Sequence, residues 1–244
     1  MIALVVFLIA VLLLLAFTFM RRKSPAVFRK IEAYERLKRV VGQAVEDGTR
    51  LHISIGRGNL FTPRGGSALA GLAMLRRLSE RTSLSDHPPI VSSGDASLAV
   101  LSQDTLQAGY HAAGAEDQYR FTTGRLTGLT PFAFAAGTIP IIRDENVSAN
   151  VVIGDFGPEV ALLAEAADRE DTDLIAASDN PSAQAVLYVS SQEPLIGEEL
   201  FAAGAYLGAG ASHDASLQTQ DVLRWLVILA IFGGVLLKLA GINF

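Results

Sequence analysis

Two long apolar runs bracket the chain. The first, residues 2–20, contains no charged residue, no Pro and no Gly. As a helix it would be roughly 28 Å long, close to the hydrocarbon thickness of a bilayer. The second, residues 222–241, is also about long enough to span a bilayer. We therefore predict transmembrane helices over 2–20 and 222–241, with a buried or interfacial helix as the alternative for the second.

Basic residues that follow the first run set the predicted topology. Under the positive-inside rule they hold this flank in the cytoplasm. Nothing positive precedes the run and no small-residue cleavage site follows it, which disfavours a cleaved signal peptide. We predict a two-pass protein of the cell inner membrane, with both termini outside, the main domain in the cytoplasm and membrane lipids as partners. The residues expected at the membrane interface are Arg21, Arg22, Lys23, Arg224, Trp225 and Lys238.

Residues 24–47 are expected to form an amphipathic juxtamembrane helix. Ser24 and Pro25 suit its first positions, and Gly48 ends it. Its apolar residues recur at steps of three and four along the segment. This stripe either packs on the chain's own domain or forms a membrane-surface or oligomer contact. Its members are Val27, Ile31, Tyr34, Leu37, Val41 and Val45.

Between residues 50 and 207 the pattern alternates between strand and helix. The repeated order of strand, small turn and helix predicts an α/β domain with a layered, largely parallel sheet and flanking helices. Residues 138–143 and 149–153 suggest a hairpin, and the wholly apolar 185–189 suggests a central strand. Residues 208–220 are rich in Gly, Ala and Ser and read as a linker. The other expected strands are 51–55, 90–92, 119–123 and 174–177, and the expected helices are 67–81, 96–113, 158–169 and 193–207.

Glycines follow the first expected strand in the loop from Gly56 to Gly66, and Ser67 then caps a helix. Such a loop exposes backbone N–H groups and the positive end of a helix dipole, which favours anions. The spacing fits neither G-x-G-x-x-G nor the P-loop pattern, so a plain turn is the alternative. The candidate ligand-binding residues are Arg57, Gly58, Arg64, Gly65, Gly66, Ser67, Asp95 and Asp155.

Asp95 and Asp155 each follow an expected strand and precede an expected helix. In parallel sheets ligands bind beyond the carboxyl ends of the strands, which is where both residues would lie. The two carboxylates would support metal-assisted chemistry only if adjacent strands bring them together. The alternative is that Asp95 is a helix N-cap.

Composition limits the chemistry. The net charge is −5 although the stretch after the first run is basic, so the remainder is more acidic, which argues against nucleic acid as a partner. The absence of Cys excludes disulfides, thiolate metal sites and a Cys nucleophile. Ser54 lies inside a strand without the G-x-S-x-G elbow, and no H-E-x-x-H is present. The four scattered histidines, which suggest no ligand pair, are His52, His87, His111 and His213. No catalytic residue is assigned, and the cofactor stays unknown.

Three stretches resemble uncharacterised bacterial membrane-anchored α/β domain families: HISIGRG with its following helix, the SSGDAS turn, and GDFGPE before ALLAEAA. The resemblance covers most of the chain and implies a domain of unknown function between two spans. It transfers no activity.

These features lead to one principal hypothesis and two alternatives. The principal hypothesis is a membrane-anchored cytoplasmic domain that acts without catalysis, either as a homo-oligomeric scaffold or as a sensor that binds a ligand or partner. Two anchors would raise the effective concentration of neighbouring copies. The first alternative is an enzyme or nucleotide-binding module acting at Gly56–Gly66 with Asp95 and Asp155. The second is an accessory subunit of a larger membrane complex.

The two spans predict integral membrane association. After carbonate washing of membranes, we expect the chain to stay in the pellet, because burial of two apolar helices is not reversed by high pH. Immunoblotting of pellet and supernatant measures this. Recovery of the chain in the supernatant would contradict the prediction.

Overall fold

The computed structural model describes residues 2–24, 27–62, 65–83 and 85–239. It divides the chain into two compact units. One unit combines the two ends of the chain, residues 1–28 and 208–244, and the other comprises residues 29–207.

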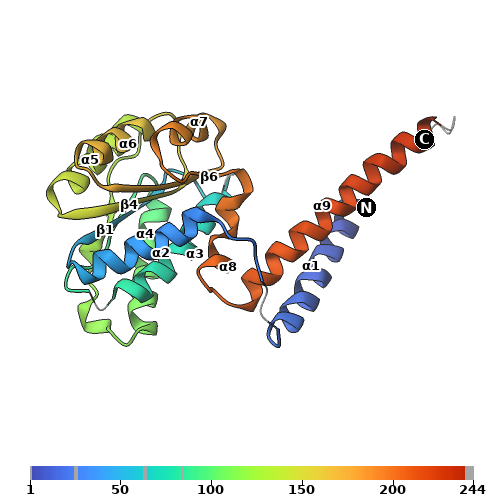
Figure 1. Cartoon of the computed structure of the whole chain (residues 1–244), viewed down its shortest axis with the longest axis horizontal. Helices are drawn as coiled ribbons and strands as arrows, with labels where there is room; N and C mark the ends of the chain where they lie inside the picture. The colour runs from blue at the N-terminus through green and yellow to red at the C-terminus, as the bar shows by residue number, and fades with distance from the viewer. Residues whose placement is uncertain (1, 25–26, 63–64, 84, 240–244) are drawn as a thin grey trace. The chain divides into compact units, whose positions relative to one another are not determined.

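The terminal unit is a pair of helices, α1 (Ile2–Arg21) and α9 (Ala211–Leu239), that pack along each other (Figure 1). Arg21 Nε donates a hydrogen bond to Gln218 Oε1 at 2.9 Å. The two helices run antiparallel (Figure 1). Both helices are long and apolar enough to cross a membrane.

The linker expected over 208–220 is wrong beyond Gly210, because α9 already begins at Ala211. Gly208 and Gly210 have positive φ values of 76° and 109°, which end the preceding structure. The polar stretch that follows contains Ala, Ser and Gln but no Gly or Pro, and Asp214 lies in the first turn of the helix, where the dipole favours an acidic side chain. Polar composition without Gly or Pro is therefore compatible with a helix at this position. The predicted end of the second span, at Gly241, lies outside the described residues.

The second unit contains a six-stranded, all-parallel sheet, so the expected layered α/β fold is confirmed. The strand order is β3-β2-β1-β4-β5-β6. The chain builds outward from β1 to β3 and then returns to the other side of β1, which is the order of doubly wound sheets. The strands are β1 (Arg50–Gly56), β2 (Ile90–Ser93), β3 (Gly124–Leu126), β4 (Val147–Asp155), β5 (Asp173–Ser178) and β6 (Leu195–Ile196).

Helices cover both faces of the sheet (Figure 1). One face carries α2 (Glu32–Glu46), α3 (Gly65–Thr82) and α4 (Ala96–Ala112). The opposite face carries α5 (Pro131–Asp144), α6 (Val160–Arg169) and α7 (Pro181–Ser190). The switch of faces follows from the reversal of strand order at β1, because each parallel crossover is right-handed. Short elements complete the unit: η1 (Glu116–Gln118), η2 (Phe121–Thr123), η3 (Gly197–Ala202) and α8 (Ala203–Tyr206).

Two expected strands are helices, which overturns the hairpin and the central strand. Residues 138–143 belong to α5, whose buried residues have helical spacing, and residues 185–189 belong to α7. Both helices begin with Pro after a capping residue: the Thr130 side chain accepts from Ala133 N, and the Asn180 side chain accepts from Ser182 N. Short apolar runs do not distinguish strand from buried helix, and these caps were the missed signal.

Other boundaries also differ from expectation. The juxtamembrane helix, expected over 24–47, begins at Glu32, and residues 27–31 are not helical. Of the residues expected as a strand over 119–123, Phe121–Thr123 form a 3-10 turn and 119–120 have no regular structure. The strand β3 follows directly, at Gly124–Leu126. Residues 193–207 contain β6, η3 and α8 in place of one helix. Pro25 lies outside the described residues.

A chain of buried polar side chains crosses the middle of the sheet. His52 Nδ1 lies 2.9 Å from Asn150 Oδ1, and His52 Nε2 lies 2.8 Å from Ser92 Oγ. Ser92 Oγ and Ser54 Oγ are 3.0 Å apart, and Asn150 Nδ2 donates to Thr172 Oγ1 at 2.7 Å. Burial favours a neutral imidazole, and its Nδ1 donates to Asn150 Oδ1. His52 is therefore a structural residue that links β1 with its two neighbours.

The α/β unit should become less stable as the pH is lowered, because of His52. The pKa of this imidazole is lowered from 6.5 to about 4, mainly by burial. The hydrogen bond to Asn150 opposes the shift, and nearby Arg125 contributes to it. Below pH 6.5 the unfolded chain binds a proton that the folded chain excludes. Stability is therefore fully present above pH 6.5 and falls by about 3 kcal/mol as the pH approaches 4. Thermal unfolding of the detergent-solubilised chain, followed by near-ultraviolet circular dichroism, measures this.

The control is His52→Gln, which does not titrate in this range. The difference in melting temperature between the native chain and the variant isolates the His52 contribution from that of the carboxylates. A difference that stays constant between pH 4 and 7 would contradict the account.

Candidate functional site

The carboxyl ends of β1 and β4 meet where the strand order reverses. In doubly wound sheets, ligands bind in the crevice beyond the strands at this position. The two strands approach very closely here. A Cβ on Gly56 (φ +78°) would lie 2.4 Å from Asp155 O, and one on Gly154 (φ +141°) would lie 2.1 Å from Ile55 O. Only glycine fits at both positions, and the chain leaves β1 with Arg57 N donating to Asp155 O at 2.9 Å.

Arg57 carries the cationic group of this junction. Its Nη1 donates to Glu159 Oε1 at 3.3 Å, and Gly157 N donates to the same oxygen at 3.0 Å. The Glu159 side chain is only 2% exposed, whereas the Arg57 side chain is 26% exposed. The buried Arg57 Nε has no hydrogen-bond partner among the described atoms. The guanidinium thus keeps donor capacity and is reached by solvent.

Gly94 leaves room for the side-chain stem of Arg57. A Cβ on Gly94 would lie 2.2 Å from Arg57 Cγ and 3.0 Å from Phe134 Cδ2. Gly94 N also donates to Gly56 O at 2.9 Å, which ties the end of β2 to that of β1. Gly94, in the SSGDAS turn, is therefore small enough to accommodate the Arg57 side chain.

The glycine loop folds mainly on itself. Asn59 Oδ1 accepts from Phe61 N at 2.8 Å, and Gly65 N donates to Thr62 O at 2.9 Å. A Cβ on Gly65 would lie 2.5 Å from Leu60 O, so this glycine allows the loop to contact the first turn of α3. These hydrogen bonds engage some of the main-chain N–H groups that the sequence predicts to bind an anion.

The other candidate ligand residues of this loop are spread around its ends. Gly58 and Ser67 are buried, and Gly66 is exposed near Phe201. The helix begins two residues before Ser67, so Ser67 lies inside α3 rather than at its cap. Arg64 lies outside the described residues.

Asp95 serves as the N-cap of α4. Its Oδ1 accepts from Ser97 N at 2.9 Å and from Leu98 N at 3.2 Å, and the Ser97 hydroxyl donates to it as well. Asp155 ends β4, but β1 lies between β2 and β4. The strands β2 and β4 are thus about 10 Å apart, twice the spacing of neighbouring strands. The condition for a shared metal site, adjacent strands, is not met.

Among the described residues, no group of three His, Asp or Glu side chains is placed to hold a metal ion. Two surface grooves, of about 380 and 430 Å³, lie between α5 and α6 and between α6 and α7. The charged residues of the first pair with one another, Arg143 with Glu170 at 3.5 Å and Arg169 with Glu165 at 2.8 Å. The carboxyl edge of the sheet is therefore the better candidate for a ligand-binding site.

Sequence reasoning missed Glu159. Glu159 was read only as part of the start of a helix after Pro158, yet it is the buried partner of Arg57. Asp179, at the end of β5, has a buried Oδ1 with no partner among the described atoms. The ion pair joins residues far apart in sequence, and no local pattern indicates it.

The fold and its carboxyl edge define an α/β protein of the doubly wound class that carries two helices able to cross a membrane. The chain belongs to the family described as domain of unknown function (DUF6754), whose model matches residues 1–244. The expected kind of family is thereby confirmed, and the bacterial origin stays a prediction. Comparison with curated proteins gave no match, and comparison with solved structures gave none either.

The close approach of β1 and β4 makes Gly56 sensitive to substitution. Gly56→Ala should destabilise the chain by about 3 kcal/mol or more, because the new Cβ meets the Asp155 carbonyl in addition to the strain of positive φ. Gly48→Ala is the matched control, since Gly48 also has positive φ (+64°) but open space around it. It should lose only about 1–2 kcal/mol. Thermal unfolding of both variants measures the difference, and equal losses would contradict the proposed contact.

Proposed function

We propose that this protein is a membrane-tethered sensor domain that binds a small ligand carrying an anionic group, without catalysing a reaction. The observation that carries the proposal is the position of Arg57, which leaves β1 where the strand order reverses. A partly exposed guanidinium suits a phosphate or carboxylate, because its fork of donors matches two oxygens.

Glu159 acts in this proposal as an internal competitor for Arg57. Their separation of 3.3 Å is longer than the 2.7–2.9 Å typical of charge-assisted bonds, so the pair is not at its optimum. A ligand anion that binds Arg57 would leave Glu159 as a buried, unpaired charge. Such a charge is costly, so binding favours movement of the residue. Movement of residues 157–160 would displace the start of α6, which gives binding a structural consequence.

The membrane part of the proposal is a two-pass hairpin. The antiparallel packing of α1 and α9 supports it, because both ends of the chain then lie on the same side of the bilayer. The basic flank formed by Arg21, Arg22 and Lys23 favours a cytoplasmic α/β domain with both termini outside. In a bacterial cell this is the inner membrane. Homo-oligomerisation, membership of a larger complex and the enzymatic alternative stay predictions.

Two substitutions should change anion binding in opposite directions. Arg57→Gln removes the cation and should weaken binding by at least about tenfold. Glu159→Gln removes the competing negative charge while keeping an oxygen for Gly157 N, so it should strengthen binding. The measurement is isothermal titration of the detergent-solubilised full chain with inorganic phosphate, pyrophosphate, mononucleotides and small dicarboxylates.

Arg81→Gln is the control, because Arg81 is an exposed arginine at the far end of α3. It should leave binding unchanged. Binding of any panel member with the same affinity to the native chain, Arg57→Gln and Glu159→Gln would show that the site lies elsewhere. If no panel member binds the native chain or Glu159→Gln, the proposal fails.

A further inference from the structure

Large apolar side chains stand exposed at the carboxyl edge of the sheet. Phe61, in the loop after β1, is 90% exposed, and Phe132, at the start of α5 after β3, is 74% exposed. Leu129 lies exposed in the turn between β3 and α5. We call these three residues the apolar rim. Phenylalanine rings left this open to water are unfavourable, and exposed apolar surface of this kind marks interaction sites.

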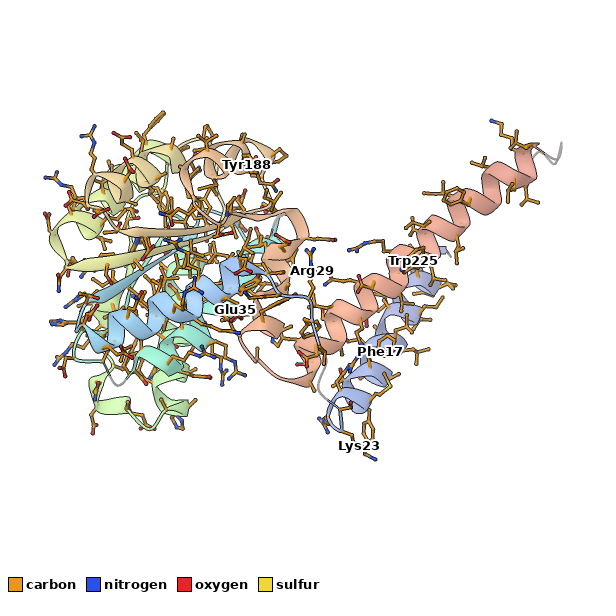
Figure 2. All side chains as sticks on the ribbon, viewed as in Figure 1. Phe17, Lys23, Arg29, Glu35, Tyr188 and Trp225 are labelled. Carbon is orange, nitrogen blue, oxygen red and sulfur yellow. The ribbon has the colours of Figure 1, made fainter. Side chains whose placement is uncertain are left out.

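The chain enters and leaves the α/β unit at the same edge. Residues 29–31 lead into α2, which runs back along the sheet to the amino end of β1, whereas η3 and α8 follow the carboxyl end of β6. Arg29 Nη2 lies 2.6 Å from Glu199 Oε1, and Tyr206 Oη donates to Arg29 O at 2.7 Å. These contacts fix the first and last residues of the unit beside each other (Figure 2 labels Arg29).

Tyr34 strengthens this junction. Its ring stacks on that of Tyr206 with centroids 4.7 Å apart, and its hydroxyl donates to Glu199 O at 2.5 Å. Burial raises the pKa of Tyr34 above its usual range, so the phenol stays a donor. The attachment point is therefore a rigid part of the domain.

The connecting segments limit how far this edge can lie from a bilayer. Residues 22–28 join α1 to Arg29 and, fully extended, reach about 29 Å. Residues 208–210 join Leu207 to α9 and reach about 14 Å. These lengths follow from chain connectivity alone. Within the α/β unit, the opposite edge is separated from this attachment point by the length of α2, about 22 Å for its 15 residues.

We propose that the carboxyl edge of the α/β unit docks on the surface of the bilayer that holds α1 and α9, with the apolar rim at the boundary between headgroups and acyl chains. Aromatic rings are favoured at this depth. Arg29 and Lys30, whose side chains are largely exposed, lie beside the attachment point and would meet lipid phosphates. The two connecting segments already hold the domain close to the bilayer. Each contact with lipid therefore forms at a high effective concentration.

Docking of this kind is separate from ligand binding at Arg57. The rim lies on the loop after β1 and the turn after β3, whereas the ion pair of Arg57 lies between β1 and β4. The surface would therefore contact lipid with or without a ligand, and loss of anion binding in Arg57→Gln would not affect it.

Single cysteines test the proposal, because the native chain contains none. The full chain is placed in phosphatidylcholine–phosphatidylglycerol nanodiscs and labelled with bimane at Phe61→Cys or Phe132→Cys. Phe121→Cys and Val189→Cys are the matched controls, since these residues are 72% and 86% exposed and lie towards the amino edge. Lipids carrying a doxyl group quench a fluorophore only at short range, so fluorescence loss on adding them measures contact with lipid.

We expect doxyl lipid to lower bimane fluorescence at positions 61 and 132 and to shift the emission to shorter wavelength relative to detergent. Labels at 121 and 189 should keep their fluorescence. Quenching at 61 and 132 that is no greater than at 121 and 189 would overturn the proposal. Quenching at the two control positions alone would show that the amino edge faces lipid and would overturn it equally.

Discussion

The close pairing of β1 and β4 is the constraint on which the α/β unit depends. Gly56 and Gly154 let the two backbones stay within hydrogen-bonding distance at their carboxyl ends, where any side chain would strike a carbonyl oxygen. Because β1 also pairs with β2, this central strand fixes both halves of the sheet. The helices then fall on opposite faces, and Arg57 emerges at the reversal between the halves.

Much of the fold was predictable because its strongest local signals agree with the tertiary structure. The strand–Gly–helix order after β1, the Asp95 cap of α4 and the Gly154 turn all lie at the carboxyl edge as expected. The errors arose where apolar runs were short. Val186 and Leu187 read as strand, but the preceding Asn180 and Pro181 start a helix. Periodicity over so few residues does not separate the two structures.

The candidate site was less predictable than the fold. Arg57 and the glycines could be proposed from their position after a strand, but Glu159 could not, because its role depends on burial beside a residue about a hundred positions away. His52 is a second example of a long-range contact that the local sequence does not predict. The residues around His52 in the sequence do not indicate its role, yet it joins three strands through Asn150 and Ser92. Long-range polar contacts carry no local pattern.

The proposed anion site and the proposed membrane-docking surface both lie at the carboxyl edge of the domain. The most direct test is hydrogen–deuterium exchange of the full chain in nanodiscs, measured by mass spectrometry with and without saturating pyrophosphate. The account predicts slower amide exchange over residues 56–62 and 155–160, at the ends of β1 and β4. Protection confined to loops at the amino edge, or identical exchange in the two states, would contradict it.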